Sequence, residues 1–195
     1  MATEQRPYRV IQKDPEFEIR FYPPAGLASV QVSGGYEAAR GEGFNELAGY
    51  IFGGNSEGRK IAMTAPVIMD IQPDVPEGTM SFVMPSSFDM DSRPIPRSSR
   101  IFFQKTEPVY AAVVTFGGYA STQDLEKHKA ELLEALDRRG IKHSDQAEFY
   151  FYDPPYKFLG RRNEVVVLLP GFTRDIQAGS SESATTQPLE PRQSR

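Results

Sequence analysis

The chain has 195 residues and a mass of 21.8 kDa, and its 39% hydrophobic and 25% charged residues suit one globular domain with a tail. A formal net charge of −4 and a pI near 5.3 leave no basic footprint for DNA or RNA. The absence of cysteine excludes disulfides, thiolate metal sites, cysteine nucleophiles and covalent haem attachment, and two histidines leave little for metal or triad chemistry.

The beginning of the sequence bears on the compartment. Residues 1–8 are polar and lack the apolar stretch of a signal peptide, and the sequence has no run of about 18 apolar residues. We therefore expect a cytoplasmic protein with no membrane span.

Alternating apolar and charged residues predict antiparallel strands between residues 8 and 32. Ile19 and Phe21 fall on one side of such a strand, and Glu18 and Arg20 fall on the other. We therefore expect one face against the core and one wet face.

Beyond residue 27 the predicted elements follow one order twice, strand–helix–strand–strand. The first set is a strand at 28–32, a helix from Tyr36 to about Gly53, and strands at 67–72 and 80–84. After a further strand at 101–105, the second set has a strand at 109–116, a helix capped by Ser121 and closed near Gly140, and strands at 147–152 and 164–169.

Two landmarks in these sets keep nearly the same offset. The Gly-Gly-Tyr segments before the helices begin 83 residues apart, at 34 and 117, and the prolines after two strands, Pro85 and Pro170, lie 85 apart. The spacing favours a duplicated unit whose halves pack as one body, because neither half could bury its sheet alone. The alternative is a chance coincidence of common tripeptides.

Two segments lack the pattern of packed elements. Residues 85–96 are rich in Ser, Asp, Arg and Pro, which predicts an exposed connector. Residues 174–195 contain no aromatic residue, so they offer too little apolar area to offset the entropy of ordering. We therefore expect one domain over 1–173 and a disordered tail over 174–195.

The first predicted helix carries an apolar stripe with glycines between its members: Tyr36, Arg40, Phe44, Leu47 and Ile51, with Gly41, Gly43 and Gly49. Each glycine weakens a helix by about 0.5–1 kcal/mol relative to alanine, so something should compensate. One interpretation is close packing of the helix on the sheet. The other is that the stripe forms one wall for a flat apolar ligand, with Arg40 at the rim to meet an anionic group.

The predicted loop at 154–163 offers a matching wall. It holds two large rings and three cations: Tyr156, Phe158, Lys157, Arg161 and Arg162. The alternative is that the rings cover the edge of the core and the cations pair with acids such as Glu164.

Four segments occur in an order that resembles the SOUL/haem-binding protein family: GGN at 53–55, KIAMTAPV at 60–67, YDPP at 152–155 and GRRNEV at 160–165. The likeness covers roughly residues 8–170. It implies an α+β fold in which two repeated strand–helix–strand–strand halves form a distorted antiparallel β-barrel with two flanking helices, distantly similar to GyrI-like domains. It also implies a carrier or buffer that binds haem or a related tetrapyrrole reversibly and non-covalently, in a shallow apolar groove with a basic rim.

The resemblance further implies which residues contact the ligand. Carried onto this sequence, they come from the first helix and the loop after YDPP: Arg40, Phe44, Leu47, Ala48, Ile51, Tyr156, Lys157 and Phe158. A porphyrin presents a large apolar face and two carboxylates, so apolar contact should supply most of the affinity. A charge in place of Phe44 or Phe158 is therefore expected to weaken binding more than removal of Lys157.

The axial ligand of a bound iron stays open. Some relatives use a histidine near the first helix, whereas this sequence has none before His128. His128 is expected to be structural, because it borders the apolar stripe of the second helix: Leu125, Leu132, Leu133 and Leu136. His143 is expected to be exposed. Other side chains able to ligate iron are Met63, Met69, Tyr50 and Tyr156.

Catalytic motifs have little support in the sequence, which lacks a glycine-rich phosphate loop and a His-Glu-x-x-His segment. We expect a monomeric binding protein with no nucleic-acid partner, and not an enzyme. Two alternatives are a GyrI-like binder or hydrolase of another flat small molecule, and a protein-interaction module that uses 85–96 and the tail.

Overall fold

The computed structural model describes residues 3–71, 77–154, 157 and 159–173. The tail expected at 174–195 lies outside these residues. So do the last residue of the strand predicted at 67–72 and three residues of the predicted binding loop, Pro155, Tyr156 and Phe158.

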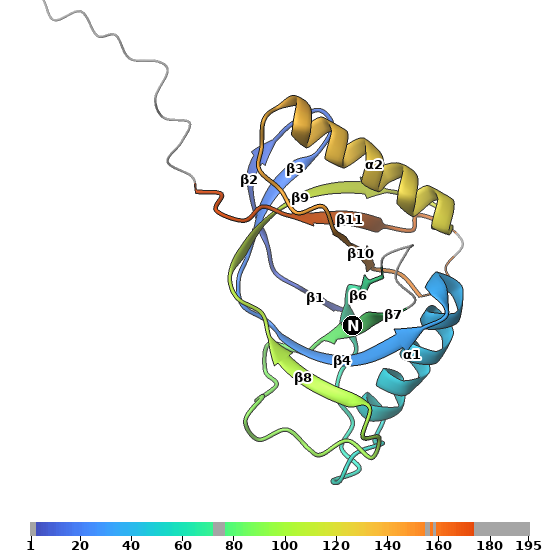
Figure 1. Ribbon diagram of the computed structural model, residues 1–195. Helices are drawn as coiled ribbons and strands as arrows, with labels where there is room; N and C mark the ends of the chain where they lie inside the picture. The colour runs from blue at the N-terminus through green and yellow to red at the C-terminus, as the bar shows by residue number, and fades with distance from the viewer. Residues whose placement is uncertain (1–2, 72–76, 155–156, 158, 174–195) are drawn as a thin grey trace, which may run out of the picture.

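In the described residues, nine strands form one antiparallel sheet and two helices pack on it (Figure 1). The strands of this sheet are β2 (Arg9–Lys13), β3 (Glu18–Tyr22), β4 (Gly26–Ser33), β6 (Val67–Asp70), β7 (Glu77–Val83), β8 (Ile101–Lys105), β9 (Val109–Phe116), β10 (Ala147–Phe151) and β11 (Asn163–Leu168). The helices are α1 (Gly35–Ile51) and α2 (Thr122–Arg138). Two short strands, β1 (Glu4–Gln5) and β5 (Thr64–Ala65), pair in parallel as a second sheet.

Apart from the edge strand β2, the order of strands across the large sheet is symmetric about the junction of β10 and β6. It runs β2-β3-β9-β11-β10-β6-β7-β4-β8, so β9-β11-β10 on one side mirrors β4-β7-β6 on the other. The strand that precedes each unit, β3 or β8, pairs with the first strand of the opposite unit, β9 or β4. The predicted strand–helix–strand–strand order is therefore present twice, and the two halves share one sheet.

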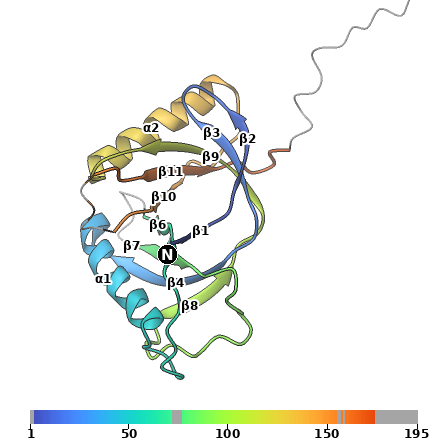
Figure 2. The ribbon, with the colours of Figure 1, turned by 180° about the vertical axis from the view of Figure 1, so that it is seen from behind.

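The sheet curls into a half-barrel, which Figures 1 and 2 show from opposite sides. Within the part of the chain that the structure describes, no pairing joins the edge strands β2 and β8, so the distorted barrel is open on one side. Helix α1 packs on β4 and β7, and α2 packs on β9 and β11, both outside the curl. The short strand β1 lies inside it.

Alternate side chains of each strand point to opposite faces, and each face has its own core. The outer core lies between the sheet and the helices and includes Leu47 of α1 and Leu132 and Leu136 of α2. The inner core is smaller and includes Tyr22 and Val166. The outer face therefore holds the helices in place, while the inner face is closed mainly by the curl.

The wet face predicted for the first strands is wrong at Arg20. Its side chain is almost completely buried and pairs with Glu18 and Glu164 on the inner face. Alternation separates the two sides of a strand, but it does not distinguish a side that meets solvent from one that the sheet closes over.

The connector predicted at 85–96 is irregular, as expected, but it is anchored to the domain. Tyr50 of α1 donates a hydrogen bond to the carbonyl oxygen of Pro94 (3.1 Å), and the Ser56 N–H donates one to that of Ile95 (2.8 Å). Pro94 is buried. This segment is therefore part of the packed domain.

Candidate ligand-binding groove

A groove of about 510 Å³ opens beside α1 on the outer face of the sheet. Its walls come from α1 and the residue after it, from β5 to β7, and from the start of the loop between β10 and β11. Most of the lining is apolar: Phe44, Phe52, Met63, Ala65, Val67, Met69, Met80, Phe151 and Pro154. The polar members are Thr3, Arg40, Thr64, Tyr152, Asp153 and Arg161. An apolar concavity with a few placed polar groups is the usual form of a small-molecule site.

The wall from α1 depends on the close approach of the helix to the sheet at Gly43. A Cβ atom there would lie 2.7 Å from Val32 Cγ1 and 3.2 Å from Met80 Cβ, so the backbone could not come this near with a larger residue. Phe44 follows and packs edge-on against Phe82, with ring centroids 5.3 Å apart, while part of it lines the groove. The close-packing interpretation holds at Gly43, and that packing shapes the wall.

The floor of the groove is set by strand register. Met69 of β6 and Met80 of β7 are cross-strand partners, and both are buried. On the same face, Val67 of β6 pairs with Phe151 of β10. Flexible thioethers beside a rigid ring make a floor that can adapt to a flat apolar surface.

The opposite wall is the beginning of the loop after β10. Asp153 is bound from two sides, by Lys157 Nζ at 2.5 Å and by the Arg162 N–H at 2.7 Å. Burial by itself would raise the pKa of Asp153, but these partners hold it below its ordinary value. Arg161 Nη1 donates a hydrogen bond to the carbonyl oxygen of Pro154 (3.1 Å). The charged side chains of the loop thus hold its own backbone.

The predicted contact residues occupy different places. Arg40 and Phe44 line the groove. Lys157 does not, but it pairs with the lining residue Asp153. Two others, Tyr156 and Phe158, lie outside the described residues. Three lie in the outer core, behind the wall: Leu47, Ala48 and Ile51.

Sequence reasoning missed the contribution of the sheet to the groove. Alternation along β6 would have placed Val67 and Met69 on one face, but no local pattern pairs β6 with β10 and so brings Phe151 beside them. Phe52, which is 65% exposed, was missed because it follows the last residue of the helical stripe. The sequence left open that the loop cations pair with acids and do not face a ligand. Arg162 does so, because its Nη2 lies 2.6 Å from Glu164 Oε1.

The histidines lie away from the groove. The His128 ring packs against Phe116, with centroids 4.3 Å apart, and neither His128 nor His143 is among the lining residues. Of the other side chains able to ligate iron, Met63 and Met69 do line it. In the described ranges no three His, Asp or Glu residues gather in a way that could hold a metal ion.

One serine motif needs its structural context. Residues 54–58 read Gly-Asn-Ser-Glu-Gly, which matches the Gly-x-Ser-x-Gly pattern of a nucleophile elbow. An elbow joins a strand to a helix, whereas this segment is the turn after α1. Ser56 Oγ is exposed and accepts a hydrogen bond from the Ile95 N–H (3.0 Å). Ser56 therefore does not have the position of a catalytic nucleophile in such an elbow.

Fold and groove together define an α+β protein built on a curled antiparallel sheet of the GyrI-like type. The chain superimposes on the crystal structure of the EcmrR C-terminal domain with a TM-score of 0.60 at 10% identity, over 83% of this chain and 96% of that one. A hydrolase from Listeria innocua gives a TM-score of 0.55 at 10% identity, over 80% and 93%. At this identity the likeness concerns the fold alone.

The chain belongs to the SOUL heme-binding protein family, whose sequence model matches residues 3–168. It is 35% identical to heme-binding protein 1 of Xenopus laevis over 155 residues, which cover 76% of this chain and 81% of the relative. It is 34% identical to heme-binding protein 2 of Homo sapiens over 157 residues, 76% of each. The predicted family is confirmed. No helix in the described residues has the length and apolar character needed to span a membrane.

Proposed function

We propose that this chain binds haem or a related tetrapyrrole reversibly and without a covalent bond, in the groove beside α1, and serves as a carrier or buffer. The observation that carries the proposal is an apolar groove of about 510 Å³ with Arg40 and Arg161 in its lining, in a member of a heme-binding protein family. A porphyrin combines a broad apolar face with two carboxylates, which this lining matches. The relatives named heme-binding proteins 1 and 2 support it.

The proposed contacts divide into apolar and charged groups. Phe44 meets the face of the ring, and Arg40 meets a carboxylate. Lys157, Tyr156 and Phe158 remain proposed contacts from the loop. The remaining three residues of the predicted set support the helix wall from behind: Leu47, Ala48 and Ile51.

Apolar contact dominates the expected affinity. Each 100 Å² of apolar surface removed from water contributes about 2.5 kcal/mol, whereas an exposed ion pair contributes roughly 0–1 kcal/mol. An open groove buries only part of the ligand, which suits a protein that must release its cargo.

Titration of the purified chain with hemin, followed at the Soret band, tests the proposal. We expect a saturable spectral change at micromolar protein, and the same change in His128→Ala, because His128 packs on Phe116 away from the groove. A titration with no saturable change would remove the proposal.

The proposal extends to the compartment, the oligomeric state and the partners of the protein. We infer a cytoplasmic monomer with one domain over 1–173, no nucleic-acid partner and no catalytic role. The acidic composition supports the absence of a nucleic-acid partner. The lack of catalytic geometry at Ser56 supports a binding role.

A second candidate function uses a cavity of about 420 Å³ on the inner face. Glu148 lines it and accepts a hydrogen bond from the Tyr150 hydroxyl (2.9 Å), and burial raises the pKa of this carboxyl. Such a group favours the alternative of a binder or hydrolase of another flat molecule. A ligand held there would be lost in Glu148→Gln but not in a variant at Phe44, which separates the two sites.

A further inference from the structure

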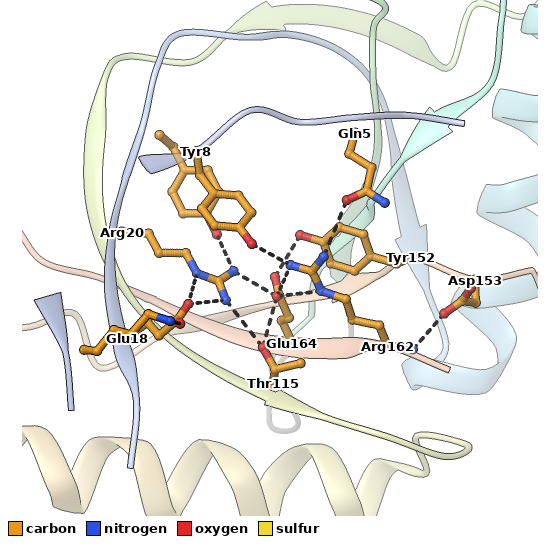
Figure 3. A network of polar contacts seen from close by, with 11 residues as sticks. Gln5, Tyr8, Glu18, Arg20, Thr115, Tyr152, Asp153, Arg162 and Glu164 are labelled. Atoms are coloured by element: carbon orange, nitrogen blue, oxygen red, sulfur yellow. Dashed lines mark hydrogen bonds and ion pairs between the residues drawn. The ribbon is translucent and has the colours of Figure 1, made fainter. Parts of the chain in front are cut away.

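A network of buried charges lies on the inner face of the sheet, at the base of the loop wall of the groove (Figure 3). Its centre is Glu164 of β11, which is fully buried. Glu164 Oε1 accepts hydrogen bonds from Arg20 Nη1 (2.8 Å) and Arg162 Nη2 (2.6 Å). It also accepts one from Thr115 Oγ1 (3.1 Å), and Oε2 accepts one from the Tyr152 hydroxyl (2.8 Å). A carboxylate without solvent is tolerated only when its oxygens are paired in this way.

The partners of Glu164 are themselves fixed. Arg20 Nε donates to Glu18 Oε2 (2.8 Å), and the Arg20 guanidinium carbon lies 4.2 Å from the centroid of the Tyr8 ring. Arg162 Nη2 donates to the Tyr8 hydroxyl (3.1 Å). Charge-assisted and stacking contacts together hold both guanidinium planes in one orientation.

One member of the network, Tyr152, reaches the groove directly, and a second, Arg162, packs on its ring, with the guanidinium carbon 4.0 Å from the ring centroid. Burial and the negative charge of Glu164 raise the pKa of Tyr152, so its hydroxyl remains a donor. Two backbone N–H groups close the base of the loop: that of Tyr152 donates to the Arg162 carbonyl (3.2 Å), and that of Arg162 donates to the Asp153 side chain at Oδ2 (2.7 Å).

We propose that Glu164 is a positioning residue for the groove: it does not line the groove, but it fixes Tyr152 and Arg162, and through them the wall formed by residues 152–154. The inference rests on the proposed function of the groove. A wall held in place before the ligand arrives does not have to be ordered on binding, which raises affinity without any new contact.

Two variants and one control test this role by hemin titration. Glu164→Gln keeps the shape and removes the charge, and Tyr152→Phe keeps the ring and removes one hydrogen bond. Ser29→Ala is the control, because it removes a buried contact of the same sheet, Ser29 Oγ to Ser81 Oγ at 2.8 Å, and neither serine lines the groove. We expect the dissociation constant to rise roughly tenfold in Glu164→Gln and about threefold in Tyr152→Phe, with no change in Ser29→Ala.

Hydrogen exchange of the ligand-free protein gives a readout that general destabilisation would not reproduce. We expect faster exchange in Glu164→Gln and Tyr152→Phe in the peptide that contains Tyr152, Asp153 and Arg162, with α1 and α2 exchanging as in the Ser29→Ala control. Uniformly faster exchange overturns the proposal, and so does wild-type hemin affinity in both variants. If the wild type itself binds no hemin, the function of the groove fails, while the exchange pattern still decides whether Glu164 holds the wall. Tyr152→Phe keeps the test decisive where Glu164→Gln does not fold.

Discussion

Phe44 and Lys157 show, at the scale of single residues, why the groove should depend more on apolar area than on charge. Phe44 packs against Phe82 and also lines the groove, so a ligand that covers its ring adds apolar burial to a surface already fixed. The Lys157 side chain is 42% exposed and held by Asp153 at 2.5 Å. A ligand carboxylate must therefore compete with Asp153 and with water for the same ammonium.

Substitution of these two residues should have unequal effects. Phe44→Asp is expected to raise the hemin dissociation constant by about tenfold or more, because it removes apolar area and places a charge against the porphyrin face. Lys157→Ala is expected to raise it by less than about threefold. Soret titrations of both variants, with circular dichroism as the control for folding, measure the difference. Equal losses in the two variants would contradict the dominance of apolar contact.

At the scale of elements, local periodicity predicted the helices and the longer strands, because their apolar residues recur at a regular spacing. In α2, Ser121 accepts the Asp124 N–H (3.1 Å), as predicted, and three of the four stripe leucines are buried: Leu125, Leu132 and Leu136. β1 and β5 were not predicted, because two residues have no period and only their pairing, Glu4 with Thr64, defines them. The part of the groove formed by the sheet was not predicted for a related reason. It depends on the pairing of β6 with β10, two strands that are far apart in the sequence.

The glycines of α1 allow a matched test at this scale. Gly43→Ala is expected to lower the free energy of unfolding by about 1–3 kcal/mol, because its Cβ would lie 2.7 Å from Val32 Cγ1. Gly41 is exposed with nothing within 4 Å of its Cβ position, so Gly41→Ala should raise it by about 0.5–1 kcal/mol through helix propensity. Urea unfolding of both variants measures the two changes. Stabilisation in both would show that α1 does not need its close approach to the sheet.

At the scale of the whole molecule, the curl of the sheet determines whether a polar strand face meets solvent or is buried. Arg20 has the alternation of a residue on a wet strand face, yet the closed inner face buries it and pairs it with Glu164 at 2.8 Å. The inner face is closed because each half contributes a strand to the other: β3 pairs with β9, and β8 pairs with β4. Spacing along the chain predicted the two units, but which strands cross between them is a property of the assembled sheet.

The strand exchange predicts that neither half folds alone. A chain divided between Ser92 and Arg93 leaves β3 without β9, β4 without β8 and β6 without β10, so each fragment exposes the faces that its neighbour covers. We expect the intact chain to unfold in one cooperative transition, and each fragment alone to show none by circular dichroism. Mixed in equal amounts, the fragments should recover the sheet signal, because every pairing of the nine strands is then available again. A cooperative transition in either fragment alone would mean that one unit buries enough surface by itself, and that the joined sheet is not what stabilises the fold.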